Sequence, residues 1–379
     1  IYSLGVMAFE LLTGNLPFSG KPIDVLLNKQ QQTPPSLAHL AGVPPDLGRL
    51  CDDLLAINPS QRPSGRAVLA RLSGSAPITL STNNSLSMSG LFVGRERELA
   101  TLDATYRRVV SSGSPAMVTV QGDSGVGKSA LVRRFVHTLR KDPASPVILR
   151  GTCYERETVP YKAIDGIIDA LAKHLSRLNR QLVPALLPED AALLLKAFPV
   201  LAHVEAFAGQ RTPEVLPDAT ELRRRVFRAL RELLQKVSKR SPLALVIDDL
   251  HWADADSLAL LQAVLQPPDA PPLILIVTSR TAATGEEALG NPAVNAWLAE
   301  RFETIQVDRL SNTESIELAR SLLHRAGVFD TEAEQVVARE AAGHPLFIDE
   351  LTRQGAELRG TTHLVLDEAL SRRASQLEP

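Results

Sequence analysis

Cysteine is scarce in this chain, with only two residues, Cys51 and Cys153, among 379. They lie far apart in the sequence and form no metal-binding pattern, which is consistent with a reducing compartment. An excess of one charge is also missing, because the formal net charge is -2 and the pI is about 6.5. Without a basic stripe, nothing in the composition calls for a nucleic acid or an anionic membrane as a partner.

Long apolar runs are missing as well. No run reaches the roughly 18–20 residues of a membrane span, and no signal peptide is visible, so we expect a cytoplasmic protein. With 44% hydrophobic and 22% charged residues, the chain is long enough for two or three globular domains. It begins at Ile1 without Met and ends at Pro379 inside a helical pattern, so we expect a fragment of a longer polypeptide.

The most specific signal is a glycine-rich segment at residues 121–129, which fits the P-loop pattern G-x-x-x-x-G-K-[ST]. The apolar residues 116–120 before it are typical of a buried strand, and residues 130–136 after it have helical spacing. The sequence therefore predicts a strand, a phosphate-binding loop and a helix in that order.

The residue types of this loop suit phosphate. Its glycines permit a close backbone approach, so that N–H groups and the helix N-terminus face phosphate oxygens. Lys128 is expected to reach the β- and γ-phosphates as a catalytic residue, and Ser129 to bind Mg²⁺. The residues of the loop that we predict to bind nucleotide are Gly122, Asp123, Ser124, Gly125, Val126, Gly127, Lys128, Ser129 and Ala130.

A second motif, at residues 243–249, is an apolar strand that ends in two carboxylates, as a Walker B element does. Asp248 at the strand end suits a hard cation such as Mg²⁺. Asp249 could orient or deprotonate the attacking water and is the second predicted catalytic residue. The alternative is a strand followed by an Asp-rich turn that caps a helix from Asp254.

Three further segments, residues 147–153, 273–280 and 303–310, are expected to be strands, and residues 161–240 to be mostly helical. Together these patterns predict an α/β fold in which helices flank a parallel P-loop NTPase sheet. The arginines between Arg223 and Arg231 favour a solvated helix face, although one of them could meet phosphate or a neighbouring subunit.

Three short motifs carry a family resemblance: "VGRERE" at residues 93–98, "DDLHWAD" at 248–254 and "GHPLF" at 343–347. With the P-loop, they resemble STAND-type AAA-related ATPases over roughly residues 91–379. The resemblance implies that Val93, Gly94 and Arg95 lie against adenine. It also implies that Arg280 is a catalytic residue near the γ-phosphate, and that Pro345, in a helical lid, contacts adenine.

We expect His251 and Trp252, which follow the two acids, to pack the strand-to-helix turn rather than to act as ligands. The same resemblance also likens residues 364–377 to the first helix of a winged-helix region.

Residues 1–72 resemble a different family, the C-terminal lobe of serine/threonine protein kinases, through "YSLGVMAFELLTGNLPF" and "LLAINPSQRPS". In that family Arg62 would pair with a glutamate of the activation segment, which this chain lacks. The glycine-rich loop, the strand lysine and the H-R-D and D-F-G motifs are missing too, so we expect no phosphorylation through residues 1–72. The apolar helix at residues 1–12 is expected to be buried on most sides. An unrelated small helical domain is the alternative.

The expected organisation is a kinase-lobe fragment (1–72), a flexible linker (73–90), an ATPase domain (91–310) and a helical lid with the start of a winged-helix region (311–379). The expected function is an ATP-binding switch in a serine/threonine kinase that slowly hydrolyses ATP with Mg²⁺. Its expected partners are ATP, ADP and other domains of the parent protein, with a homo-oligomer as one possible assembly. A non-hydrolysing nucleotide-binding scaffold, or a module of a transcriptional regulator or cyclase-linked protein, remains the alternative.

Overall fold

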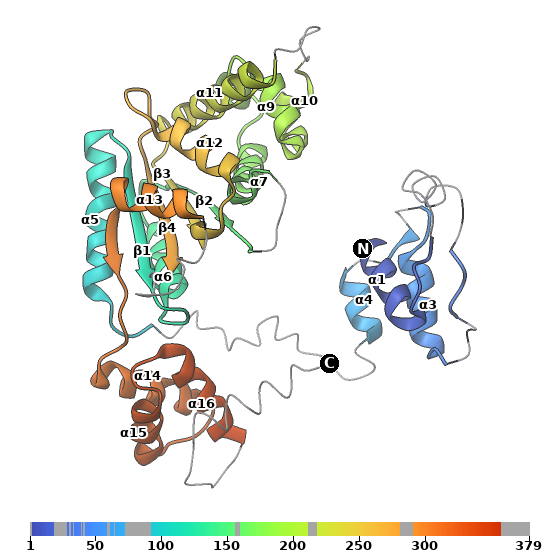
Figure 1. Cartoon of the computed structure of the whole chain (residues 1–379), viewed down its shortest axis with the longest axis vertical. Helices are drawn as coiled ribbons and strands as arrows, with labels where there is room; N and C mark the ends of the chain where they lie inside the picture. Colours follow the sequence, from blue (N-terminus) through green and yellow to red (C-terminus); the bar gives the residue numbers. More distant parts are fainter. Residues whose placement is uncertain are drawn as a thin grey trace. The chain divides into compact units, whose positions relative to one another are not determined.

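The apolar segments of the chain pair into a five-stranded parallel sheet in the computed structural model of the protein (Figure 1). Its order is β2-β3-β4-β1-β5, so β4 lies between the strand that precedes the P-loop and the strand that ends in Asp248. The predicted α/β fold is confirmed. The strands are β1 (Ala116–Gly122), β2 (Val147–Thr152), β3 (Leu243–Asp248), β4 (Leu273–Arg280) and β5 (Glu303–Gln306).

The chain divides into two units, Ile1–Ser87 and Met88–Pro379. The predicted linker at 73–90, the helix expected at 364–377 and part of the loop that follows β2 (156–159) lie outside the described residues. The structure describes residues 2–18, 29, 32, 34–38, 40, 42–58, 61–63, 65–72, 92–155, 160–210, 218–280 and 291–357.

Both faces of the sheet are covered by helices, which explains why its strands are continuously apolar. In β3, Leu243, Leu245 and Ile247 face the larger core, while Ala244 and Val246 face the smaller one. The smaller core is closed by α5 (Glu96–Ser112) and α6 (Lys128–Leu139). The larger core is closed mainly by α7 (Lys162–Arg177), α11 (Ala219–Ser238) and α12 (Ala255–Leu265).

Shorter elements complete this unit. They are α8 (Val183–Leu186), α9 (Ala191–Ala197), η3 (Pro199–His203), α10 (Glu205–Ala208), η4 (Leu250–Trp252) and α13 (Pro292–Arg301). Within the described ranges, no helix combines the length and the apolar character that crossing a membrane requires.

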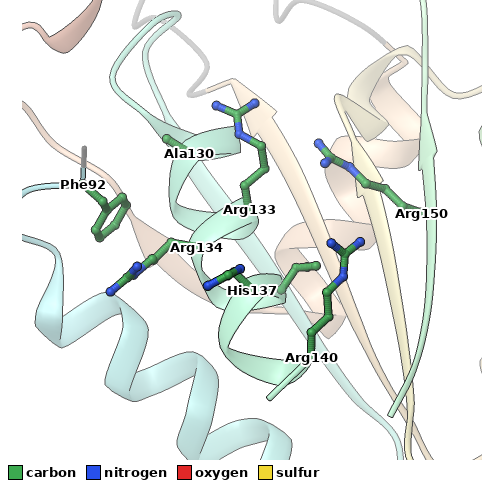
Figure 2. Close-up of a pocket in the computed structure, with 8 residues that line it drawn as sticks. Phe92, Ala130, Arg133, Arg134, His137, Arg140 and Arg150 are labelled. Carbon is green, nitrogen blue, oxygen red and sulfur yellow. The ribbon is translucent and has the colours of Figure 1, made fainter. Parts of the chain in front are cut away.

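Helix α6, which follows the P-loop, has two different faces. It buries Leu131, Val132 and Phe135 against the sheet. Its outer face carries Arg133, Arg134, His137 and Arg140 (Figure 2). The 3.6-residue period therefore separates an apolar stripe from a basic one.

The arginines of α11 have partners within the chain, as expected for a solvated helix face packed on its neighbours. Asp190, which is buried, accepts from two of them and fixes α11 beside α9. The ion pairs are Arg223–Asp256, Arg224–Glu221, Arg225–Asp190 and Arg228–Asp190, and Arg231 donates to the carbonyl of Ala263.

The helical region that follows β5, where the sequence predicts a lid, is called the lid below. It consists of α14 (Asn312–Arg325), α15 (Thr331–Glu340) and α16 (Pro345–Glu357), packed around their own apolar core. Ser311 and Glu314 form a capping box at the start of α14. Val93, which precedes α5 and the sheet in the sequence, also packs against the core of these helices.

The first unit contains α1 (Tyr2–Thr13), α3 (Pro45–Leu54) and α4 (Gly65–Leu72). The expectation that α1 is buried on most sides is wrong, because Leu4, Met7 and Leu11 are exposed. The packing partner of α1 is α3, which covers one side through Phe9. The remaining apolar face of α1 is therefore left in solvent.

Arg62, which the kinase resemblance would pair with a glutamate, has local partners. Its guanidinium donates to the carbonyls of Ala56, at 2.8 Å, and Ile57, at 3.1 Å, and lies over the ring of Tyr2. These contacts hold α1 and the segment after α3 together.

Candidate functional site

The P-loop connects β1 to α6 and turns back on itself around Lys128. The buried ammonium of Lys128 donates to the carbonyls of Gly122, at 2.9 Å, and Asp123, at 2.8 Å. Burial lowers the pKa of Lys128, while the nearby carboxylate of Asp249 opposes that change. The ammonium is thus held at the loop by neutral acceptors, which a phosphate with formal negative charge can replace.

The predicted metal ligands lie together at the carboxyl edge of the sheet. The hydroxyl oxygen of Ser129 is 3.5 Å from Oδ1 of buried Asp248. Neighbouring ligands of an octahedral Mg²⁺ ion with bonds of about 2.1 Å are about 2.9 Å apart. The two oxygens are somewhat farther apart than that, and a small rotation of the Ser129 side chain would bring them to the spacing of one shared Mg²⁺ ion. Binding of Mg²⁺ by these two residues stays a prediction. No group of three or more His, Cys, Asp or Glu side chains that could hold a metal by itself occurs among the described residues.

Asp248 also has a cationic partner. The guanidinium of Arg150, on the neighbouring strand β2, pairs with Oδ2 of Asp248. The carboxylate is therefore neutralised by the protein itself.

Thr278 joins the two adjacent acids. Its buried hydroxyl lies 3.4 Å from Oδ1 of Asp248 and accepts from the backbone N–H of Asp249 at 2.8 Å. Asp249 has a left-handed backbone with φ of 57°, which is uncommon for a residue with a Cβ. The hydroxyl therefore holds the turn that directs Asp249 away from the strand.

Arg280 ends β4 and lies opposite Gly122 in the strand register. It affects the pKa of Lys128, so the two cations are close enough to interact. The order of the strands thus brings Arg280, Asp249 and Lys128 to one edge of the sheet.

His251 lies beside this edge and is buried against Trp252. Within the described residues neither of its ring nitrogens has a hydrogen-bond partner. Burial lowers the pKa of His251, with Asp249 opposing and Arg280 adding to the effect. The ring packs the strand-to-helix turn, as expected, and is also within electrostatic reach of the site.

The lid contacts the P-loop directly. Nε2 of His344 lies 2.9 Å from the carbonyl oxygen of Ser124. A carbonyl only accepts, so the imidazole carries its proton on Nε2 and donates it. Gly125 has φ of 79°, and a Cβ there would approach His344 to 2.7 Å and Leu346 to 3.0 Å. Only glycine therefore lets the lid lie this close to the loop.

The segment predicted to face adenine is held between the sheet unit and the lid. A Cβ on Gly94 would come within 1.9 Å of the Glu314 carboxylate, so this backbone touches α14. Arg95 donates to the carbonyl of Asp308 and pairs with Glu98 at 3.3 Å. Pro345 is buried at the start of α16. Contact of these residues with adenine stays a prediction.

Sequence reasoning missed Arg150 and Thr278. The available signal for Arg150 was an arginine directly after the apolar residues 147–149 of the predicted strand. Thr278 gave no signal, because a threonine in a buried strand is an ordinary β-former.

Comparison with known families agrees with this geometry. Residues 91–277 match the family model described as the AAA ATPase domain. This part of the chain is an AAA ATPase domain. The matched residues include the P-loop, Asp248, Asp249 and residues 93–95. Thr278, Arg280 and the lid follow the matched range in the sequence.

Two curated relatives are each 24% identical to the chain. One is an uncharacterized protein of Rhizobium meliloti, matched over 70% of this chain and 25% of the relative. The other is the hybrid signal transduction histidine kinase G of Dictyostelium discoideum, matched over 70% of this chain and 9% of the relative. The chain thus spans a quarter or less of the curated relatives it matches.

Solved structures with a similar fold include the Walker-type ATPase PABY2304 of Pyrococcus abyssi. It is 15% identical, with a TM-score of 0.47 over 76% of this chain and 73% of that one. The Aeropyrum pernix ORC1 protein, solved in complex with DNA, is 18% identical, with a TM-score of 0.42 over 76% of this chain and 66% of that one.

Proposed function

We propose that the AAA ATPase domain and its lid form a switch that binds ATP with Mg²⁺ and hydrolyses it slowly, within a serine/threonine protein kinase. The observation that carries the switch is the contact between His344 of the lid and Ser124 of the P-loop. A phosphate bound in the loop changes the surface on which the lid packs. ATP and ADP can then favour different lid positions, provided that they bind those positions with different free energies.

The residues of the site have complementary roles in this proposal. Lys128 exchanges its two carbonyl acceptors for β- and γ-phosphate oxygens, and Ser129 and Asp248 hold Mg²⁺. The bound Mg²⁺ offsets the charge on the phosphates during transfer. Asp249 orients a water and accepts its proton as the water oxygen bonds to the γ-phosphorus and the bond to the ADP oxygen breaks. Arg280 stabilises the charge on the departing phosphate.

The nucleotide content of the purified chain tests the site. We expect nearly stoichiometric ADP after denaturation and chromatography, and its loss from Lys128→Ala, because one charge-assisted contact contributes about 1.5–3 kcal/mol, or roughly 10- to 100-fold in affinity. Lys173→Ala, at an exposed position of α7, is the matched control and should retain ADP. Unchanged ATP affinity in Lys128→Ala would refute the site.

Turnover distinguishes the switch from a non-hydrolysing scaffold. Asp249→Asn keeps the size of the side chain but cannot accept the proton of the water, so we expect phosphate release to fall at least about tenfold. ATP affinity, measured in parallel, should change little. A wild-type chain that releases no phosphate, or an Asp249→Asn variant with unchanged turnover, would favour the scaffold.

The kinase context is the part of the proposal that reaches furthest beyond the site. It is supported by the kinase-like motifs of residues 1–72 and by the apolar residues Leu4, Met7 and Leu11, which a larger lobe would cover. These residues also favour a kinase over a transcriptional regulator or a cyclase-linked protein. The coding sequence upstream of residue 1 is the test. It should encode a glycine-rich loop, a strand lysine and H-R-D and D-F-G motifs, and their absence would remove the kinase from the proposal.

A further inference from the structure

A basic cavity lies on the outer face of α6 and extends from Ala130, which directly follows the P-loop, to Arg140 (Figure 2). Its volume is about 260 Å³, and five of its eight lining residues are basic. Arg133, Arg134 and His137 come from α6, Arg140 directly follows it, and Arg150 comes from β2. Two elements that are separate in the sequence therefore direct cations into one hollow.

The positive charge of this cavity is poorly balanced. Asp248 pairs with Arg150, and within the described part of the chain Arg133, Arg134 and Arg140 have no ion-pair partner. The pKa of Arg133 is lowered by burial and then by the neighbouring charge of Arg150. Like charges held this close repel each other, so an anion between them would be stabilising.

We propose that this cavity binds a compact phosphorylated small molecule and that its occupancy controls Asp248 through Arg150. Guanidinium groups bind phosphate with two parallel hydrogen bonds, and several of them converge here. The volume is below the roughly 300–1,000 Å³ of pockets for drug-sized ligands, which favours an anion of about the size of pyrophosphate over a whole nucleotide.

Arg150 connects the cavity to the metal site. Its guanidinium lines the cavity and also pairs with Asp248, the predicted Mg²⁺ ligand. An anion in the cavity competes with Asp248 for Arg150, so filling the cavity frees the carboxylate for Mg²⁺. This control of the metal site rests on the proposed ATPase function, whereas binding of the anion does not.

Pyrophosphate is the probe for binding, measured by titration calorimetry on the full chain with saturating ADP and with EDTA. ADP fills the P-loop, and EDTA prevents pyrophosphate from acting through Mg²⁺. We expect one site in the wild type and at least about tenfold weaker binding in Arg133→Gln/Arg140→Gln. The control Arg97→Gln/Arg301→Gln removes the same charge from exposed positions outside the cavity and should bind as the wild type does.

The coupling is tested by a double-mutant cycle in the same titration. Asp248→Asn removes the competitor for Arg150, so pyrophosphate should bind more tightly, by about tenfold. In an Arg150→Gln background the same Asp248→Asn change should have no effect. Equal effects of Asp248→Asn in the two backgrounds would overturn the control through Arg150.

Other results would overturn the binding site itself. One such result is that the wild type binds no pyrophosphate, or binds it no more tightly than Arg133→Gln/Arg140→Gln does. Another is that single-stranded DNA or polyglutamate binds more tightly than pyrophosphate and depends on the same arginines. A chain that holds no ADP would contradict the proposed function instead. In that case, pyrophosphate binding would be compared between Lys128→Ala and the triple variant Lys128→Ala/Arg133→Gln/Arg140→Gln. A difference between the two would support the cavity even though the ATPase proposal had failed.

Discussion

Thr278 and Lys128 show how hydrogen bonds within the chain hold the site. The hydroxyl of Thr278 bridges Asp248 and the backbone of Asp249, and the ammonium of Lys128 is bound by two carbonyls of its own loop. Lys128, Asp248 and Thr278 thus each have a hydrogen-bond partner within the chain. Nucleotide binding must exchange these partners rather than fill an unsatisfied site.

Buried histidines make the stability of the folded chain depend on pH. Burial lowers the pKa of His174, His251 and His344 in the folded state. Between those lowered values and the unfolded value of about 6.5, the unfolded chain binds more protons. The free energy of unfolding should therefore fall as the pH falls through that window, and fall no further below the folded pKa values.

Urea denaturation at several pH values between about 7.5 and 5 measures this effect. His251→Leu removes one of the three groups and should make the dependence shallower. His203→Leu, at an exposed position, is the matched control and should leave it unchanged. A pH dependence that is equally steep in His251→Leu would contradict the role of that ring.

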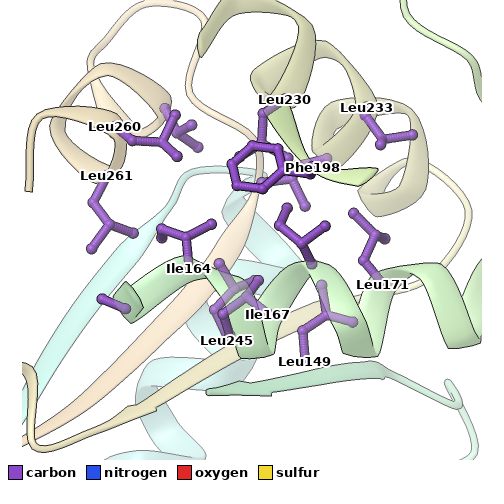
Figure 3. Close-up of a cluster of buried hydrophobic side chains, with 14 of the residues drawn as sticks. Leu149, Ile164, Ile167, Leu171, Phe198, Leu230, Leu233, Leu245, Leu260 and Leu261 are labelled. Atoms are coloured by element: carbon purple, nitrogen blue, oxygen red, sulfur yellow. The ribbon is translucent and has the colours of Figure 1, made fainter. Parts of the chain in front are cut away.

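At the scale of the elements, the positions of the helices and strands were largely predictable from the sequence, whereas the order of the strands in the sheet was not. The strands are apolar without interruption because α5 and α6 cover one face and α7, α11 and α12 the other, where side chains such as Ile167, Leu245 and Leu260 meet (Figure 3). Strand order depends on contacts between distant segments, which no local pattern contains. The strand expected at 303–310 ends at Gln306, because the chain there leaves the sheet for the lid.

The same distinction applies to the site. The P-loop, Asp248 and Asp249 could be named from the sequence because each belongs to a contiguous pattern. Arg150 and Thr278 were missed because their importance comes from neighbouring strands. The burial expected for α1 was wrong, since an apolar helix needs a covering partner and α3 covers only part of it.

Asp190 provides a test of packing between elements. Its buried carboxylate holds Arg225 and Arg228, and the hydrogen bond from Arg225 is the main cause of its lowered pKa. Asp190→Ala should lower the free energy of unfolding by about 2 kcal/mol, because two charged donors lose their acceptor while their guanidinium groups stay partly in water. The control Asp256→Ala removes a half-exposed partner of Arg223 and should cost at most about 1 kcal/mol. Equal losses in urea denaturation would contradict this view of α11.

On the scale of the whole molecule, the lid contact should control how long nucleotide stays bound. His344→Ala removes one hydrogen bond to the P-loop and the packing on Gly125. We expect ADP to dissociate about tenfold faster, which corresponds to about 1.4 kcal/mol, measured with a fluorescent ADP analogue. Phe329→Ala, at an exposed lid position, should not change the rate. An unchanged rate in His344→Ala would separate the lid from nucleotide release.

Among the described residues, the lid touches the rest of its unit at two separate places, with Gly94 against Glu314 and His344 against Ser124. A rigid helical body held at two points cannot tilt far at one without straining the other. We therefore expect the lid to release both contacts together. Each molecule would then be either closed or open, and nucleotide would change the fraction of molecules in each state. Single-molecule distance measurements across the lid would then show two populations and no continuum between them.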